Sequence, residues 1–326
     1  MKECYLGVDI GSVSVNVVLL DNENNVFEKR YVRTEGKPIQ TLQKTIIDIS
    51  KKYDNTLKIL GCGTTGSGRH LASVMLGADV VKNEITAHAK AAINQYKNVK
   101  TIIEIGGQDS KIIIIRNGIV IDFSMNTVCA AGTGSFLDRQ AERLNIPINQ
   151  FGEVALKSKN PVRIAGRCAV FAESDMIHKQ QLGHKVEDIL YGLCQALARN
   201  YISNVAKGKQ IEEPIIFQGG VAANLGMKKA FEELLNTEII ILSNFDVMGA
   251  IGAAILAKEK TKGIYTNFYG FDFIKNTFDS RGFECKGCSN YCEVINILNN
   301  NKVIAIWGDR CGKWSNGKQQ PVENIQ

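Results

Sequence analysis

Two turns of this 326-residue chain place acidic residues close to glycine at the end of an apolar run. The first turn is Asp9-Ile10-Gly11-Ser12, and the second is Glu104-Ile105-Gly106-Gly107-Gln108-Asp109. Because glycine has no side chain, backbone N–H groups at such turns can approach an anion closely. The pair of turns therefore predicts binding of a triphosphate between them.

The acidic side chains of these turns suit magnesium and water better than phosphate, since carboxylates do not contact phosphate directly. We expect them to hold Mg²⁺ through water and to orient the attacking water. The candidate catalytic residues are Asp9, Glu104, Gln108 and Asp109. Hydroxyl and ammonium groups nearby, those of Ser12, Ser14 and Lys111, are expected to donate to phosphate oxygens.

A third glycine motif runs from Phe217 to Asn224 and opens a predicted helix. Taken alone, this motif fits a simple strand-to-helix connection as well as it fits a ligand contact. After two acidic turns, its Gly219-Gly220 pair favours a place where adenine or ribose packs on the backbone. The residues expected to contact ATP and Mg²⁺ are Gly11, Ser12, Ser14, Asn16, Gly106, Gly107, Lys111, Gly132, Thr133, Gly219, Gly220, Val221 and Asn224.

The elements that position these motifs follow a repeated order. Apolar runs predict strands at 5–10, 13–20 and 27–32, a helix at 39–53 and a strand at 57–60. The strand-turn-strand theme returns at 101–115 and 119–123, and strands at 214–217 and 238–242 alternate with helices at 224–235 and 249–258. This repetition predicts two similar α/β domains that face each other across a ligand cleft.

In this arrangement the chain resembles the superfamily of actin, ATP-driven heat-shock chaperones and sugar kinases over residues 4–260. The resemblance implies duplicated domains of the ribonuclease H type around a nucleotide cleft. We expect a first actin-like ATPase domain at 1–98 and a second, with cluster-binding helices, at 99–260. The last helix, about 246–260, is expected to pack back on the first domain. Residues 261–326 form a cysteine-rich extension, which we expect to be an appended module or the beginning of a further domain.

Two cysteines precede predicted helices. Cys129 lies in the stretch 126–134, ahead of a helix-like run at 136–144, and Cys168 lies in a similar position in Gly166-Arg167-Cys168-Ala169. Helix N-termini stabilise thiolates. A cubane iron–sulfur cluster takes four thiolates, so a two-fold dimer that contributes Cys129 and Cys168 from each subunit would complete the set. Isolated cysteines of this kind are, however, more often small buried residues.

The motifs around these cysteines, together with Glu-Ile-Gly-Gly-Gln-Asp-Ser-Lys at 104–111, closely resemble the activators of 2-hydroxyacyl-CoA dehydratases and the related ATPase subunits of benzoyl-CoA reductases. The resemblance implies a homodimer with a bridging [4Fe-4S] cluster that accepts an electron from ferredoxin or flavodoxin. ATP binding and hydrolysis then change the angle between the cluster-bearing helices, and the electron passes to an acyl-CoA dehydratase or reductase. Many members have Asp where this chain has Glu104, which leaves the role of that residue the least secure.

The extension brings four further thiols into a short span: Cys285, Cys288, Cys292 and Cys311. Four thiolates could bind zinc or a second cluster, and unpaired thiols in a tail are the equal alternative. The four histidines are scattered, so surface or core roles are expected for them.

Composition excludes several classes of protein. The chain is 44% hydrophobic with a formal net charge of +6, a modest value that argues against a nucleic-acid partner. It has no apolar stretch of membrane-spanning length, no export signal, and an odd number of cysteines, nine, which favours reduced thiols in the cytoplasm over a membrane or secreted location.

Two rival functions remain open. A small-molecule kinase of the same fold would keep the nucleotide turns and would not need Cys129 or Cys168. A nucleotide-dependent scaffold, like the filament-forming relatives of actin, would need neither cysteine nor a partner enzyme.

Overall fold

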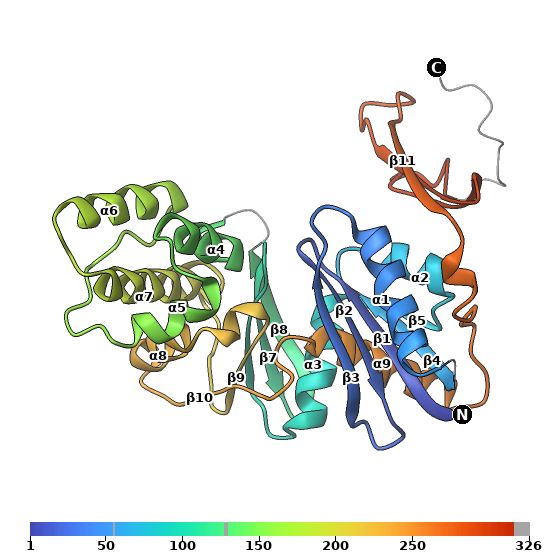
Figure 1. Ribbon diagram of the computed structural model, residues 1–326, viewed down its shortest axis with the longest axis horizontal. Helices are drawn as coiled ribbons and strands as arrows, with labels where there is room; N and C mark the ends of the chain where they lie inside the picture. Colours follow the sequence, from blue (N-terminus) through green and yellow to red (C-terminus); the bar gives the residue numbers. More distant parts are fainter. Residues whose placement is uncertain (55, 127–129, 316–326) are drawn as a thin grey trace. The chain divides into compact units, whose positions relative to one another are not determined.

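The structure is a computed structural model that describes residues 1–54, 56–126 and 130–315 (Figure 1). It divides into two compact units. The first comprises residues 1–10, 15–82 and those from Ala253 onward, and the second comprises residues 11–14 and 83–252. Each unit contains one five-stranded sheet, and the first unit also contains a three-stranded sheet near the C-terminal end.

The sheet of the first unit has the strand order β3-β2-β1-β4-β5. Its strands are β1 (Lys2–Ile10), β2 (Ser14–Leu20), β3 (Val26–Arg33), β4 (Leu57–Thr65) and β5 (Val80–Val81). The central strand β1 runs antiparallel to β2 and parallel to β4. It is buried from Cys4 to Ile10, as expected for a strand covered on both faces.

The sheet of the second unit has the same pattern, β8-β7-β6-β9-β10. Its strands are β6 (Thr101–Ile105), β7 (Ser110–Arg116), β8 (Ile119–Asn126), β9 (Ile215–Gln218) and β10 (Ile239–Ile240). Here β6 is central, antiparallel to β7 and parallel to β9. The duplication predicted from the repeated strand-turn-strand theme is thus present in the strand order of both sheets.

Helices cover the first sheet through one apolar stripe each. Helix α1 (Pro38–Lys52) buries Ile39, Leu42, Ile46 and Ile49, which recur every three or four residues and so share one face. These side chains pack in one core with β1, β2, α2 (Arg69–Leu76) and residues of the short helix η3 (Phe273–Lys275).

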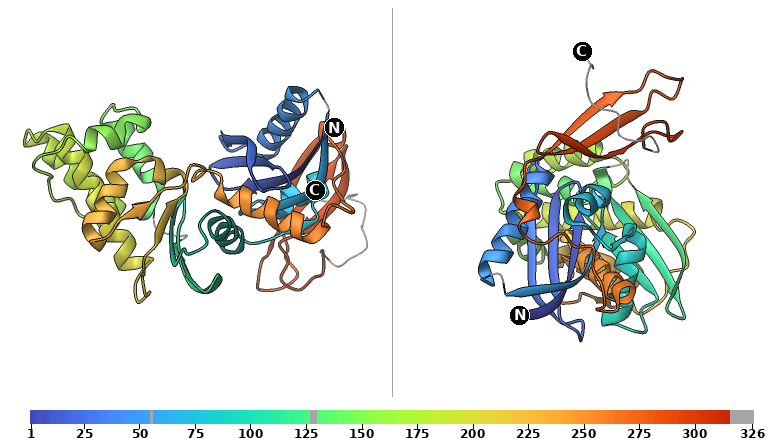
Figure 2. Two further views of the ribbon diagram at one scale, coloured as in Figure 1. Left: turned by 90° about the horizontal axis from the view of Figure 1, so that it is seen from below. Right: turned by 90° about the vertical axis from the view of Figure 1, so that its right-hand side faces the viewer.

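In the second unit, five helices lie on one side of the sheet and α3 lies on the other (Figures 1 and 2). The helices are α3 (Glu84–Gln95), α4 (Gly134–Arg143), α5 (Ile148–Ala155), α6 (Ala169–Gln181), α7 (Val186–Asn204) and α8 (Leu225–Leu235), with short helices η1 (Ala130–Gly132) and η2 (Gly220–Ala223). The core between sheet and helices includes Ile103, Ile112, Leu193 and Phe231. Helix α9 (Met248–Thr261) belongs to the first unit from Ala253 onward.

The C-terminal segment contains regular structure that the sequence pattern did not indicate. Strands β11 (Phe278–Glu284), β12 (Glu293–Asn299) and β13 (Lys302–Trp307) form an antiparallel meander, drawn in orange to red in Figure 2. Buried Val294, Ile297 and Leu298 lie on β12, the middle strand. No helix in the described ranges combines the length and apolar character that crossing a bilayer requires.

Candidate functional site

The turn between β6 and β7 holds the second acidic motif, and hydrogen bonds attach it to the start of α4. Gly106 N–H donates to the Asp109 carbonyl at 3.0 Å, which closes the turn. The N–H groups of Gly134 and Ser135, at the start of α4, donate to the carbonyls of Gly106 and Gly107 at 2.9 Å. The structure thus brings the glycines of the acidic turn close to the start of α4, which directly follows Gly132 and Thr133. Gln108 is exposed on this turn.

Lys111 lies at the centre of an acidic cluster. Its Nζ atom is 3.0 Å from Glu104 Oε2, 2.9 Å from Asp109 Oδ1 and 2.7 Å from Glu84 Oε2. Glu104 and Lys111 are directly opposite each other on β6 and β7, so they form a cross-strand pair. Three of these four residues belong to the predicted motif, and the fourth, Glu84, enters from α3.

Burial and mutual charge set the protonation of this cluster. The side chains of Lys111 and Glu104 are 2% and 5% exposed. Burial raises the pKa of Glu104 to about 7, although Lys111 acts in the opposite direction. Burial also opposes the charged form of Lys111, but the carboxylates of Glu104, Glu84 and Asp109 together outweigh it and raise the pKa of the ammonium group. Glu104 can therefore change its protonation near neutral pH while Lys111 stays charged.

The ammonium group of a lysine has three N–H donors. In Lys111 all three face carboxylates, which leaves none directed to a phosphate oxygen. This arrangement differs from the predicted phosphate contact. Lys111 instead holds three carboxylates close together in a buried place where they would otherwise repel one another.

Two residues of α3 were missed as site residues. Glu84 completes the cluster around Lys111, and His88, one helical turn later, places its Nδ1 atom 2.8 Å from Gln218 Nε2 of β9. Burial, reinforced by Lys111, lowers the pKa of His88 to about 4, so its ring is neutral at pH 7. The sequence did contain a signal for the start of this helix, because Asn83 is a typical N-cap residue, and its side chain accepts a hydrogen bond from Thr86 N–H. Glu84 and His88 are four residues apart and therefore lie on the same face of α3.

The third glycine motif approaches the same cluster. Gly219 has φ +87°, and a Cβ atom there would lie 2.4 Å from the Ile105 carbonyl oxygen and 2.7 Å from Glu104 Oε1. Only glycine allows this backbone so close to β6. Val221 is buried in the unit's core, and the Asn224 side chain caps α8 by accepting from Met227 N–H at 3.1 Å. The motif therefore lies beside Glu104, and Asn224 has a structural role.

The first acidic turn lies at the end of β1. Asp9 is paired with Asn16 of β2, and both residues are buried. The loop after β4 packs on this turn, since a Cβ atom at Gly66 would lie 2.5 Å from Asp9 Oδ1 and Gly68 N–H donates to the Ile10 carbonyl. Between the two strands, Gly11 N–H donates to the Ser14 carbonyl at 2.9 Å and closes a turn that contains Ser12.

The predicted cluster ligands are only partly described. Cys129 lies outside the described residues. Cys168 is the N-cap residue of α6, as predicted, and its half-buried side chain makes no capping hydrogen bond. Val170 and Phe171, in the first turn of α6, are each 68% exposed. An unpaired thiol thus lies beside an exposed apolar surface.

Cys285, Cys288 and Cys292 lie in the loop that joins β11 to β12, and Cys311 follows the end of β13 at the same end of the sheet. Cys285 N–H donates to the Cys292 carbonyl at 2.8 Å, and the Trp314 indole N–H donates to Cys285 Sγ at 3.3 Å. The indole hydrogen bond is the main cause that lowers the pKa of Cys285. Within residues 1–54, 56–126 and 130–315, no three His, Cys, Asp or Glu side chains come together as metal ligands. Of the two alternatives for Cys285, Cys288, Cys292 and Cys311, the zinc or second-cluster site is not formed among the described residues.

Comparison with known proteins agrees with this geometry. Residues 6–257 match the model of the BadF/BadG/BcrA/BcrD ATPase family. The 2-hydroxyisocaproyl-CoA dehydratase activator of Clostridioides difficile is 33% identical over 262 residues, which is 79% of this chain and 96% of that protein.

Solved structures extend the likeness to three dimensions. Component A of (R)-2-hydroxyglutaryl-CoA dehydratase from Acidaminococcus fermentans is 33% identical with a TM-score of 0.74, over 80% of this chain and all of that one. The activator of 2-hydroxyisocaproyl-CoA dehydratase from Clostridium difficile with bound ADPNP is 33% identical with a TM-score of 0.72, over 79% of this chain and 96% of that one. A ROK family glucokinase from Streptomyces griseus, 14% identical over 78% of this chain and 99% of that one with a TM-score of 0.52, shares the fold alone. The predicted actin and sugar-kinase fold class is thereby confirmed.

Proposed function

This chain belongs to the BadF/BadG/BcrA/BcrD ATPase family, and from that premise we propose that it is an ATP-dependent activator that transfers low-potential electrons one at a time. Its proposed partner is a 2-hydroxyacyl-CoA dehydratase or a reductase of the benzoyl-CoA type. Ferredoxin or flavodoxin is the proposed electron donor, and the cytoplasm is the proposed location.

The observation that carries the ATPase part is the equivalence of two acidic residues in the duplicated sheets. Asp9 is the penultimate residue of β1 and pairs with Asn16, and Glu104 is the penultimate residue of β6 and pairs with Lys111. Each strand is central in its sheet and is followed by a glycine-containing turn. Paired acidic turns of this kind suit the water and metal positioning on which phosphoryl transfer depends.

Asp109 is the carboxylate of the second acidic turn that is best placed to hold a hydrated magnesium ion. Asp109 and Glu84 keep 29% and 19% of their side chains exposed, and Asp109 lies on the glycine turn itself. Mg²⁺ prefers carboxylate oxygens and retains several waters, and when bound it neutralises the charge that develops on the phosphates. Asp109 would hold it through water, while Glu104, in its ionised form, would accept a proton from the attacking water.

The surroundings of Cys168 fit a cluster shared by two copies of the chain. A [4Fe-4S] cluster requires four thiolates, and each copy would contribute Cys129 and Cys168. Cys168 lies at the N-terminus of α6, where the helix dipole stabilises a thiolate. Exposed Val170 and Phe171 supply apolar surface that a homodimer would bury. When bound, the cluster would supply one-electron redox chemistry.

The proposal is tested with anaerobically purified protein by measuring ATP hydrolysis and iron content together. Glu104→Gln is expected to lower the hydrolysis rate by about 100-fold or more, because the residue that accepts the proton of water is lost. Glu153→Gln, a change of the same chemistry at an exposed position of α5, is the control and retains the wild-type rate. Hydrolysis that survives Glu104→Gln, or depends on a sugar acceptor and not on iron, would refute the proposal and favour the kinase.

A further inference from the structure

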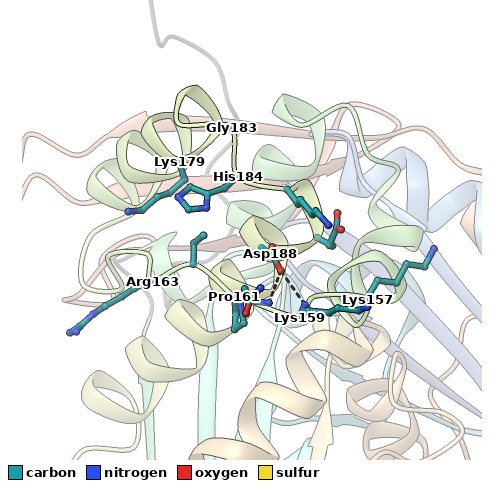
Figure 3. Close-up of a pocket in the computed structure, with 12 residues that line it drawn as sticks. Lys157, Lys159, Pro161, Arg163, Lys179, Gly183, His184 and Asp188 are labelled. Carbon is teal, nitrogen blue, oxygen red and sulfur yellow. Dashed lines mark hydrogen bonds between the residues drawn. The ribbon is translucent and has the colours of Figure 1, made fainter.

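A pocket of about 680 Å³ lies within the second unit, formed by residues that the proposed ATPase does not use. Its walls come from the segment after α5, the C-terminal end of α6 and the start of α7. Figure 3 shows Lys179 and His184 on one side of the opening, Lys157 and Lys159 across from them, and Asp188 between.

The wall formed by residues 158–162 is held rigidly against α7. The Asp188 carboxylate accepts hydrogen bonds from Ser158 Oγ at 2.7 Å and from the N–H groups of Asn160 and Lys159 at 3.0 and 3.2 Å. The Ser158 hydroxyl and these N–H groups hold the pKa of Asp188 below its usual range. The Asp188 carbonyl also accepts from Val162 N–H at 3.1 Å. The backbone that bears Lys159 and Arg163 is therefore positioned before any ligand arrives.

The lining carries more cationic than anionic side chains. Five of the lining residues are lysine or arginine, against only Glu187 and Asp188, which gives a formal excess of three positive charges with His184 neutral. None of the five cationic side chains forms an ion pair in the described part of the chain, although lysines elsewhere in this unit do, such as Lys228 with Glu232. The five are Lys157, Lys159, Arg163, Lys179 and Lys185.

A concave surface lined by charges of one sign concentrates its electrostatic field and attracts counter-ions. We propose that this pocket is a binding site for a small ligand that carries several phosphate groups. Long lysine and arginine side chains around the opening can each contact a different phosphate, and the arginine can do so with two hydrogen bonds. The volume is in the range of pockets that enclose a small molecule, whereas a protein partner binds over a much broader face.

This site is distinct from the proposed nucleotide site. Its lining includes none of the residues predicted to contact ATP, and it lies at the opposite end of α6 from Cys168. Thirteen helical residues separate the two ends, which corresponds to roughly 20 Å. Ligand binding here therefore need not compete with ATP.

Calorimetric titration with inorganic tripolyphosphate tests the proposal, with saturating Mg-ADP present to occupy a nucleotide site. The test variant is Lys159→Ala/Arg163→Ala. The control is Lys228→Ala/Lys229→Ala, which removes the same charge from α8 outside the pocket. Thermal unfolding of each variant establishes that it is folded.

Binding to the wild type that weakens at least about tenfold in the pocket variant, and is unchanged in the control, is the expected result. Equal weakening in both variants means attraction by net charge alone and overturns the proposal. Absence of binding to the wild type also overturns it. ATP hydrolysis, measured in parallel, is expected to be unchanged in the pocket variant. If the wild type does not hydrolyse ATP, the proposed ATPase function is refuted, whereas the proposed phosphate pocket is not.

Discussion

Glu104 and Lys111 form a buried ion pair across β6 and β7, with Lys111 Nζ 3.0 Å from Glu104 Oε2. Two further carboxylates, from Asp109 and Glu84, lie within 2.9 Å of the same ammonium group. One cation thus holds together residues from a strand, a turn and helix α3. The geometry of the second acidic turn depends on it.

Replacing Lys111 with methionine is expected to destabilise the fold strongly, because the change leaves Glu104 buried without its cation. We expect a loss of about 3 kcal/mol or more in the free energy of unfolding measured with urea. Lys228→Met removes a lysine that pairs with Glu232 on the surface of α8, and it should cost less than about 1 kcal/mol. Similar losses for the two variants would show that the cluster does not depend on Lys111.

The rate of ATP hydrolysis should depend on the protonation of Glu104. Burial raises the pKa of this carboxyl to about 7, so the ionised form that accepts a proton from water is lost as the pH falls through 7. We expect kcat/KM for ATP to decline below about pH 7, since this parameter reports the free enzyme. A profile that stays flat down to pH 5 would contradict the role given to Glu104.

Gly219 is expected to tolerate no side chain. A Cβ atom there would meet the Ile105 carbonyl oxygen at 2.4 Å, whereas Gly208, which also has positive φ, has nothing within 4 Å of its Cβ position. Both Gly→Ala variants bear a cost of positive φ, and Gly219 adds the collision with β6 and a ψ of 169° that essentially only glycine adopts. Gly219→Ala should lose at least about 2 kcal/mol more in urea unfolding than Gly208→Ala. Equal losses would mean that β6 moves aside freely.

His88 should make stability depend on pH. Its pKa falls to about 4 in the folded protein from an ordinary value of 6.5, so between these values the unfolded chain binds the extra proton. The contribution of neutral His88 to stability is complete above about pH 6.5 and is lost as the pH falls toward 4. The stability advantage of wild type over His88→Gln is therefore expected to shrink by roughly 3 kcal/mol across this range. An advantage that is constant with pH would place the ring in contact with water.

The two acidic turns were predictable because each one joins two strands that are adjacent in the sequence. A four-residue turn at 106–109 pairs Ile105 with Ser110, and Glu104 then falls opposite Lys111. The same reasoning applies to Asp9 and Asn16 on β1 and β2. The strands predicted at 5–10 and 13–20, however, leave a two-residue turn that would pair Asp9 with Ser14. Local sequence therefore located the turns but not the exact cross-strand pairs.

Contacts between distant segments were not predictable in this way. Glu84 and His88 reach Lys111 and Gln218 only because α3 packs on the face of the sheet opposite to α4–α8, which no local pattern in residues 83–88 specifies. The carboxylate cluster around Lys111 was not expected for the same reason, since Glu84, one of its three carboxylate partners, lies outside the motif. The strands β11–β13 alternate weakly between buried and exposed positions, so their periodicity carried little signal.

We propose that Cys168 and Cys129 bind an iron–sulfur cluster shared by two copies of the chain. Iron and sulfide analysis after anaerobic purification tests it most directly, on wild type, on Cys168→Ala and on Cys194→Ala, a buried core thiol that serves as control. We expect about four irons per two chains in wild type and in Cys194→Ala, and none in a folded Cys168→Ala. Wild-type protein without iron after reconstitution, or a Cys168→Ala variant that keeps its iron, would contradict it.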